Sequence, residues 1–314
     1  MRPAITHATV SIGELLYNYL GKFSRRALFR PEFSLLLIDG LGYNSVCLKM
    51  KFVDKLLTAS RKNRSLLCIG LDPDPERLPV KDVFEFNRAI IDATADLVCA
   101  YKPNLAFYEA MGIRGMQILK KTVAYIPREI PVIGDAKRGD IGNTAVAYAK
   151  ALFGYFKFDA VTVNPYLGYD SIEPFLDYKN KGVFILCRTS NTSASDFQDL
   201  VDNFGMKFYQ SVALRASEWN TGGNIGLVVG ATYPDELKAI RQMCPDMPLL
   251  VPGIGAQGGD LELSIKHGTD SHGEKAIIVA ARQVLYASRG PDYAQAARAV
   301  ALELRSKINR IRGV

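Results

Sequence analysis

The residues best suited to chemistry lie in one short stretch, where Asp135, Lys137 and Asp140 follow an apolar run and precede a helical pattern. Side chains alternate along a strand, so Ile133, Asp135 and Lys137 are predicted to share one face. The spacing Asp-x-Lys-x-x-Asp then brings a carboxylate, an ammonium group and a second carboxylate to one point. A lysine held beside carboxylates remains a proton donor at neutral pH. The alternative is a solvated loop that carries three charges.

The rest of the chain predicts the elements that position this stretch. From Ser65 onward, apolar runs alternate with helical segments in units of roughly 25–40 residues, which is typical of a (β/α)8 TIM barrel. The eight predicted strands are Leu66–Leu71, Leu97–Tyr101, Val132–Ile133, Ala160–Val163, Val183–Cys187, Ile225–Val229, Leu249–Val251 and Ala276–Ala281. A doubly wound α/β sheet would need fewer strands and a glycine-rich turn after the first one, where Asp72-Pro-Asp-Pro stands instead.

Barrel enzymes place catalytic groups at the C-terminal ends of their strands. Alternation predicts four inward-facing series, each apolar or small until its charged end: Leu66, Cys68, Gly70, Asp72; Val98, Ala100, Lys102; Ile133, Asp135, Lys137; and Ile278, Ala280, Arg282. The first three series bring alternating carboxylates and ammonium groups together. Opposite neighbours favour the charged form of each group. A structural ion-pair network at the barrel rim is the alternative.

A glycine-rich segment follows the predicted seventh strand, with Gly253, Gly255 and Gly258 in G-x-G-x-x-G spacing. A dinucleotide fold does not fit, because the acidic residue about 20 positions on precedes a strand instead of ending one. In a barrel, the loops after strands seven and eight are the usual phosphate site. Glycine amides there, with Gln257 and Arg282, would form a phosphate cup. A plain turn is the alternative.

Composition limits the classes of function. The net charge of +7 is modest, and no long Lys/Arg block or stripe with interleaved aromatic residues predicts nucleic-acid binding. The five cysteines are odd in number and contain no Cys-x-x-Cys, which predicts a reducing cytoplasm without disulfides or structural zinc. No apolar run is long enough to span a bilayer, so no membrane association is expected.

Residues 1–49 differ in character from the rest of the chain. The segment is basic and acid-poor up to Arg30, whereas Met50 opens a convincing domain start. We therefore predict two parts, an N-terminal extension of residues 1–49, disordered or foreign to the native protein, and a barrel of residues 50–314. An organellar transit peptide is the alternative for the extension.

With these motifs in hand, the sequence resembles the orotidine 5′-phosphate decarboxylase family, in its longer bacterial-type subfamily. The resemblance covers about residues 50–314 and is carried by Lys102, Asp135-Ala-Lys-Arg-Gly-Asp-Ile-Gly-Asn-Thr144, Gly253-Ile-Gly-Ala-Gln257 and Arg282. It implies cofactor-free decarboxylation of orotidine 5′-monophosphate to UMP, the last step of de novo pyrimidine synthesis. It also implies a homodimer with shared active sites.

The resemblance implies roles for the charged cluster. Asp135 would face the scissile carboxylate, and Lys137 would protonate C6 of the substrate as carbon dioxide leaves. Lys102 and Asp72 would hold the ribose hydroxyls and orient Lys137.

The resemblance also implies the contacts that bind the substrate. Ser190 would contact the pyrimidine, Gln257 and Arg282 would hold the phosphate, and Asn104 would be a further substrate contact. Three residues would reach the substrate of the partner subunit: Asp140, Ile141 and Thr144.

Two positions depart from the subfamily pattern. Thr192 stands where proline is usual, and Gln283 is bulkier than the usual neighbour of the phosphate arginine. The alternative enzyme is a hexulose-phosphate-synthase-like aldolase, which shares the barrel and the Asp-x-Lys-x-x-Asp motif but depends on Mg²⁺. Agreement outside that motif favours the decarboxylase, for which no metal or other cofactor is expected.

Overall fold

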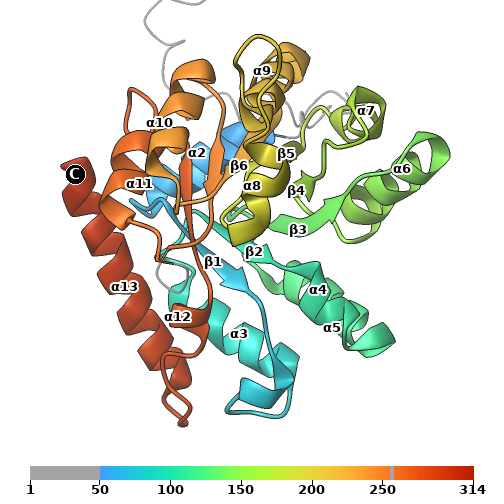
Figure 1. Ribbon diagram of the computed structural model, residues 1–314. Helices are drawn as coiled ribbons and strands as arrows, with labels where there is room; N and C mark the ends of the chain where they lie inside the picture. Colours follow the sequence, from blue (N-terminus) through green and yellow to red (C-terminus); the bar gives the residue numbers. More distant parts are fainter. Residues whose placement is uncertain (1–49, 255–257) are drawn as a thin grey trace, which may run out of the picture. The chain divides into compact units, whose positions relative to one another are not determined.

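The computed structural model describes residues 50–254 and 258–314, so the predicted extension and Gln257 lie outside the described residues. Eight parallel strands form one sheet in the order β2-β1-β8-β7-β6-β5-β4-β3 (Figure 1). Bridges from Tyr101 to Val132 and from Asn104 to Asp135 join the edge strands β2 and β3, so the sheet closes on itself. The strands are β1 (Leu67–Leu71), β2 (Ala100–Pro103), β3 (Ile133–Arg138), β4 (Ala160–Val163), β5 (Gly182–Arg188), β6 (Ile225–Val229), β7 (Leu249–Val251) and β8 (Ala276–Ala280). The predicted (β/α)8 barrel is confirmed.

Helices follow the strands along the chain and pack their apolar faces against the outside of the barrel (Figure 1). They are α3 (Val83–Thr94), α4 (Leu105–Glu109), α5 (Gly112–Tyr125), α6 (Gly142–Ala149), α7 (Glu173–Leu176), α8 (Ser195–Gln198), α9 (Phe208–Trp219), α10 (Pro234–Met243), α11 (Leu261–Gly268), α12 (Arg282–Leu285) and α13 (Tyr293–Arg312). Helix α6 continues into a π-helical segment, Lys150–Tyr155. Within the described ranges, no helix combines the length and the apolarity needed to cross a membrane.

The barrel interior holds an apolar cluster to which every strand contributes, namely Cys68, Ala100, Ile133, Ala160, Phe184, Val228, Leu250, Ile277 and Val279. Helix α2 (Phe52–Lys62) precedes the first strand and adds Phe52 and Leu56 to this cluster. The Phe52 ring meets Phe184 edge to face, with centroids 5.6 Å apart, and the Phe52 amide donates to the Asn180 carbonyl just ahead of β5. Helix α2 therefore covers the N-terminal end of the barrel and leaves the C-terminal end for a site.

Strand β8 is one residue out of phase with the prediction. Ile277 and Val279 face the interior, whereas Ile278 and Ala280, which we predicted to face inward, belong to the layer between strands and helices. A parallel barrel strand is buried on both faces, so an apolar run carries no alternation signal that could fix its phase. Arg282 still reaches the C-terminal end of the barrel, but as the first residue of α12.

Candidate active site

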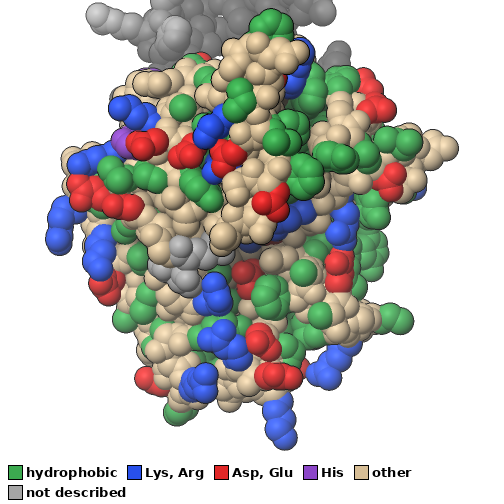
Figure 2. Space-filling model, viewed as in Figure 1, with side chains coloured by type: hydrophobic (Ala, Val, Ile, Leu, Met, Phe, Trp, Pro, Cys, Tyr) green, Lys and Arg blue, Asp and Glu red, His purple; other side chains and the backbone are tan. Residues whose placement is uncertain are grey.

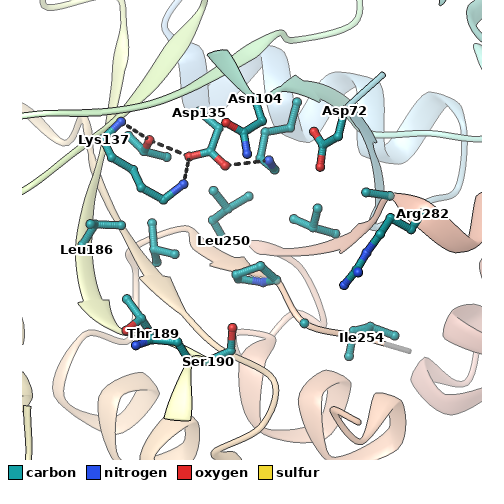
Figure 3. A pocket seen from close by; sticks show the side chains of 18 of the residues that line it. Asp72, Asn104, Asp135, Lys137, Leu186, Thr189, Ser190, Leu250, Ile254 and Arg282 are labelled. Atoms are coloured by element: carbon teal, nitrogen blue, oxygen red, sulfur yellow. Dashed lines mark hydrogen bonds and ion pairs between the residues drawn. The ribbon is translucent and has the colours of Figure 1, made fainter. Parts of the chain in front are cut away.

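A cavity of about 530 Å³ opens at the C-terminal ends of the strands. It is lined by Asp72, Lys102, Asn104, Asp135, Lys137, Thr162, Leu186, Thr189, Ser190, Asn191, Gln198, Val228, Leu250, Pro252, Gly253, Ile254, Val279, Ala281, Arg282 and Gln283. Figure 3 shows Asp135 and Lys137 on one side of this cavity and Arg282 on the other. The structure thus brings together the predicted residues at or just beyond the C-terminal ends of strands β1, β2, β3, β5 and β8.

Two lysines hold Asp135 from opposite sides. Lys102 Nζ donates to Asp135 Oδ2 at 2.8 Å, and Lys137 Nζ donates to Asp135 Oδ1 at 2.6 Å (Figure 3). The side chains of Lys102 and Asp135 are only 6% and 11% exposed, whereas that of Lys137 is 50% exposed. Lys102 and Asp135 therefore form the fixed part of the cluster, and Lys137 is the member that a molecule in the cavity can reach.

The electrostatics of this pair follow from burial and from the neighbouring charges. Burial alone would raise the pKa of Asp135, but Lys102 and Lys137 outweigh it and hold this pKa well below its usual range. Burial would also lower the pKa of Lys102, but the charges of Asp135 and Asp72 shift it upward overall. Asp135 is thus an anion and Lys102 a cation at neutral pH, as predicted.

Asp72 differs from Asp135 in the direction of its pKa shift. Burial raises the pKa of this carboxyl, and the attraction of Lys102 does not cancel that effect. Its Oδ1 is buried and has no hydrogen-bond partner in the part of the chain that the structure describes. Lys102 and Lys137 do favour the charged form of Asp72, as expected, but burial outweighs them, so the pKa of this carboxyl lies above its ordinary value.

The local backbone of β3 explains how Lys137 reaches the cavity. The pairing between β3 and β4 shifts register between Gly134 and Arg138, which marks a bulge. Lys137 has a φ of +48°, in the left-handed region that non-glycine residues seldom adopt. A regular strand would therefore not present this lysine in the same way.

The predicted phosphate end of the cavity contains Gly253, Arg282 and Gln283. Gly253 has a φ of +100°, a conformation that favours glycine. The Nε2 atom of Gln283 is buried and has no hydrogen-bond partner among the described residues. Gln257, the second predicted phosphate ligand, lies outside them.

The loop after β5 forms the side of the cavity that carries Ser190. The Thr189 amide donates to Gln198 Oε1 at 2.9 Å, and Gln198 Nε2 donates back to Thr189 Oγ1 at 2.8 Å. Ser190 packs closely on Gly230, where an added Cβ would lie 2.8 Å from the Ser190 Cβ. The loop is thus folded back on the end of β5, with Ser190 packed against the residue that follows β6.

The residues predicted to serve a partner subunit do not line this cavity. Asp140 Oδ1 accepts a hydrogen bond from the Ile141 amide at 2.8 Å. Ile141 is 56% exposed, and Thr144 is exposed in the first turn of α6. All three follow the cavity residues Asp135 and Lys137 closely in the sequence, but none of them lines the cavity.

Sequence reasoning missed four polar residues of the lining: Thr162, Thr189, Asn191 and Gln198. Thr162 had a signal, because it stands two residues after the inward-facing Ala160 on β4. Gln198 had none, because its place depends on how a loop folds back. Across residues 50–254 and 258–314, no group of three or more His, Cys, Asp or Glu side chains is placed to hold a metal ion.

Comparison with known proteins agrees with this geometry. Residues 65–300 match the model of the orotidine 5′-phosphate decarboxylase / HUMPS family. The chain is 55% identical to the orotidine 5′-phosphate decarboxylase of Dehalococcoides mccartyi strain BAV1, over 84% of this chain and 99% of the relative. It is also 55% identical to the Cellvibrio japonicus enzyme of the same name, over 83% of this chain and 98% of the relative.

A solved structure gives the same result at the level of the fold. The Leishmania donovani OMP decarboxylase superposes with a TM-score of 0.76 and 39% identity, covering 84% of this chain and all of that one. The relatives match over nearly their whole length, and the barrel, the cavity and the charged cluster lie within the matched residues. The chain is therefore an enzyme of the carboxy-lyase class and belongs to the orotidine 5′-phosphate decarboxylase / HUMPS family.

Proposed function

We propose that this chain decarboxylates orotidine 5′-monophosphate to UMP, the last step of de novo pyrimidine synthesis, without a metal or other cofactor. Family membership and the names of the relatives support this reaction. The observation that carries the mechanism is Asp135, held as an anion by two lysines of which one, Lys137, is half exposed to the cavity.

Lys137 and Asp135 would act on the reacting atoms. When the bond between C6 and the carboxylate breaks, the electron pair stays on C6, and the Lys137 ammonium donates the proton that makes UMP. A fixed cation beside this developing negative charge is preorganised electrostatic stabilisation. Asp135 would face the departing carboxylate and orient the Lys137 ammonium group through their ion pair.

The remaining residues would bind the parts of the substrate that do not react. Lys102 and Asp72 would hold the ribose hydroxyls, and the buried Asp72 Oδ1 without a partner offers an acceptor for one of them. Asn104 would add a further substrate contact, and Ser190 would contact the pyrimidine. Binding energy from such remote groups can lower the barrier when it is realised in the transition state.

The phosphate would bind at the opposite end of the cavity, to Arg282 and Gln257. Arg282 is an exposed guanidinium that lines the cavity across from Lys137 (Figure 3). Guanidinium groups suit phosphate because they donate two parallel hydrogen bonds.

We further propose a homodimer in which Asp140, Ile141 and Thr144 complete the partner's site. The support is an exposed apolar surface on and near α6, part of which is visible at the right of Figure 2. Its members include Ile141, Val146, Tyr148, Tyr155, Tyr166 and Leu167, each at least 36% exposed. A monomeric soluble protein seldom leaves so many large apolar side chains exposed together.

A cytoplasmic location and a dispensable extension of residues 1–49 complete the proposal. The cysteines within the described ranges, Cys68, Cys99, Cys187 and Cys244, are buried and free, which agrees with a reducing compartment.

An ultraviolet assay of orotidine 5′-monophosphate loss, with and without EDTA, tests the proposed reaction. The purified protein should turn over this substrate equally well in both conditions. No turnover, together with an EDTA-sensitive aldolase activity on a hexulose phosphate, would contradict the proposal and favour the alternative enzyme of the family.

A further inference from the structure

The bulge in β3 places a single residue of β4 against the reacting groups. Gly134 pairs with Val161 and Arg138 pairs with Val163, so the three residues from Asp135 to Lys137 lie opposite Thr162 alone. A bulge leaves backbone groups without their usual ladder partners. The Lys137 amide finds its acceptor in a side chain, because it donates to Thr162 Oγ1 at 2.9 Å.

The second hydrogen bond of this hydroxyl has a fixed direction. Thr162 Oγ1 lies 2.9 Å from Asp135 Oδ1. The lowered pKa of Asp135 leaves its carboxylate without a proton to give, so the hydroxyl must be the donor. One hydroxyl therefore accepts from the backbone of Lys137 and donates to the carboxylate that pairs with the Lys137 side chain.

The surroundings of Thr162 make this arrangement rigid. The residue is 1% exposed, and a β-branched side chain has few χ1 rotamers. It shares the inward face of β4 with Ala160, its backbone pairs with Phe184 on β5, and its chain neighbours Val161 and Val163 pair with β3. Its hydroxyl cannot turn away from Asp135 and Lys137 without leaving buried polar groups unpaired.

We propose that Thr162 is a positioning residue that sets the geometry of the Asp135–Lys137 pair through its hydroxyl. This inference rests on the proposed decarboxylation. The hydroxyl holds both the left-handed backbone of Lys137 and the orientation of Asp135. Among the described residues, it forms no hydrogen bond with the phosphate end of the cavity or with the predicted ribose ligands. Its loss should therefore lower kcat and leave KM nearly unchanged.

The test compares two variants that differ in the hydroxyl. Thr162→Val keeps the shape of threonine and removes the hydroxyl, while Thr162→Ser keeps the hydroxyl and removes the methyl group. We expect kcat to fall about 10-fold to 100-fold in Thr162→Val, the range for losing a hydrogen bond to a charged group. KM should change less than about threefold, and Thr162→Ser should retain kcat within about threefold of wild type. If Thr162→Val does not fold, Thr162→Ala against Thr162→Ser makes the same comparison.

Thr122→Val is the matched control. Thr122 lies on α5 with 0% exposure, and its hydroxyl accepts from Asn87 Nδ2 at 3.0 Å, outside the cavity lining. This variant should lose stability and keep its kcat per folded molecule. Amide hydrogen exchange gives a readout besides activity, since the Lys137 amide should exchange faster in Thr162→Val than in wild type or Thr162→Ser.

If the wild-type protein decarboxylates orotidine 5′-monophosphate, two results would overturn the inference about Thr162. One is a Thr162→Val enzyme with the kcat of wild type, and the other is an equal loss of kcat in Thr162→Val and Thr162→Ser. A wild-type protein that does not decarboxylate orotidine 5′-monophosphate would instead reject the proposed function itself, so the two failures are distinguishable.

Discussion

Lys137 Nζ lies 2.6 Å from Asp135 Oδ1, yet the lysine side chain is 50% exposed whereas that of the aspartate is 11% exposed. The pair thus joins a fixed buried anion to a cation that faces the cavity. Lys102 and Thr162 hold the anion from the other side and from β4. A surface ion pair would exchange partners with water, but here only the lysine has room to meet another molecule.

Asp72→Asn should stabilise the protein at neutral pH while it impairs the enzyme. Burial raises the folded-state pKa of Asp72, so folding binds its proton more tightly, and stability falls as the pH rises above about 3.9, the usual value in an unfolded chain. Asparagine does not titrate, so we expect its free energy of unfolding to exceed that of wild type at pH 7. The difference should vanish near pH 3.

Urea unfolding at both pH values measures this effect. Asp246→Asn is the control, because the Asp246 side chain is 94% exposed and its removal should change stability by less than about 0.5 kcal/mol. An Asp72→Asn protein that is less stable than wild type at pH 7 would show that the net environment of Asp72 favours its charge.

Arg282→Ala should reduce only the contribution that the phosphate of the substrate makes to kcat/KM. We expect kcat/KM for orotidine 5′-monophosphate to fall on the order of 100-fold, because a charge-assisted contact to phosphate is lost. The nucleoside orotidine carries no phosphate, so its slow turnover should be the same in wild type and variant. Arg289→Ala is the control, since Arg289 is exposed after α12 and does not line the cavity. An equal fall in kcat/KM for both substrates would show that Arg282 does not act through the phosphate.

Mixing two inactive chains tests whether the site is shared. In a mixed dimer Asp140→Ala and Lys137→Ala fall in the same site, so the other site holds both residues, and about a quarter of wild-type activity should return after random mixing. Mixing Asp135→Asn with Lys137→Ala is the control, because both residues lie in the same subunit's cavity and no site is repaired. Equal recovery in both mixtures, or none in verified mixed dimers of the first pair, would argue against a shared site.

A chain that begins at Met50 should fold and turn over substrate like the full chain. Helix α2 begins at Phe52, and Phe52 and Leu56 close the N-terminal end of the barrel. Thermal unfolding should therefore be unchanged by removal of residues 1–49, whereas Phe52→Ala in the shortened chain should cost about 3–5 kcal/mol. If the shortened chain fails to fold, the extension is part of the structure.

The sequence predicted most of the fold because strand and helix periodicities and the order of elements are local signals. It predicted Lys102 and Asp135 because polar residues in strands have a readable phase, whereas Lys137 reaches the cavity through a bulge that regular alternation does not include. It could not predict the phase of β8, where Ile277 to Ala280 are apolar on both faces. The upward pKa shift of Asp72 could not be predicted from the sequence either, because burial depends on packing from several strands.

The site residues that sequence reasoning missed are also set by tertiary contacts and not by local signals. Thr162 acquires its role from a bulge in the neighbouring strand, and no residue pattern in β3 predicted that bulge. Gln198 reaches the cavity only because the loop after β5 folds back onto Thr189. Both depend on contacts between segments that are distant in sequence.

The most direct test of the proposed mechanism is the turnover of orotidine 5′-monophosphate by Lys137→Ala, measured by ultraviolet absorbance in the presence of EDTA. Wild type and Lys121→Ala, an exposed lysine on α5, should turn over at the same rate. Lys137→Ala should lose at least about 1,000-fold in kcat while its circular dichroism and thermal unfolding stay those of a folded barrel. A folded Lys137→Ala enzyme with near-normal kcat would contradict this mechanism.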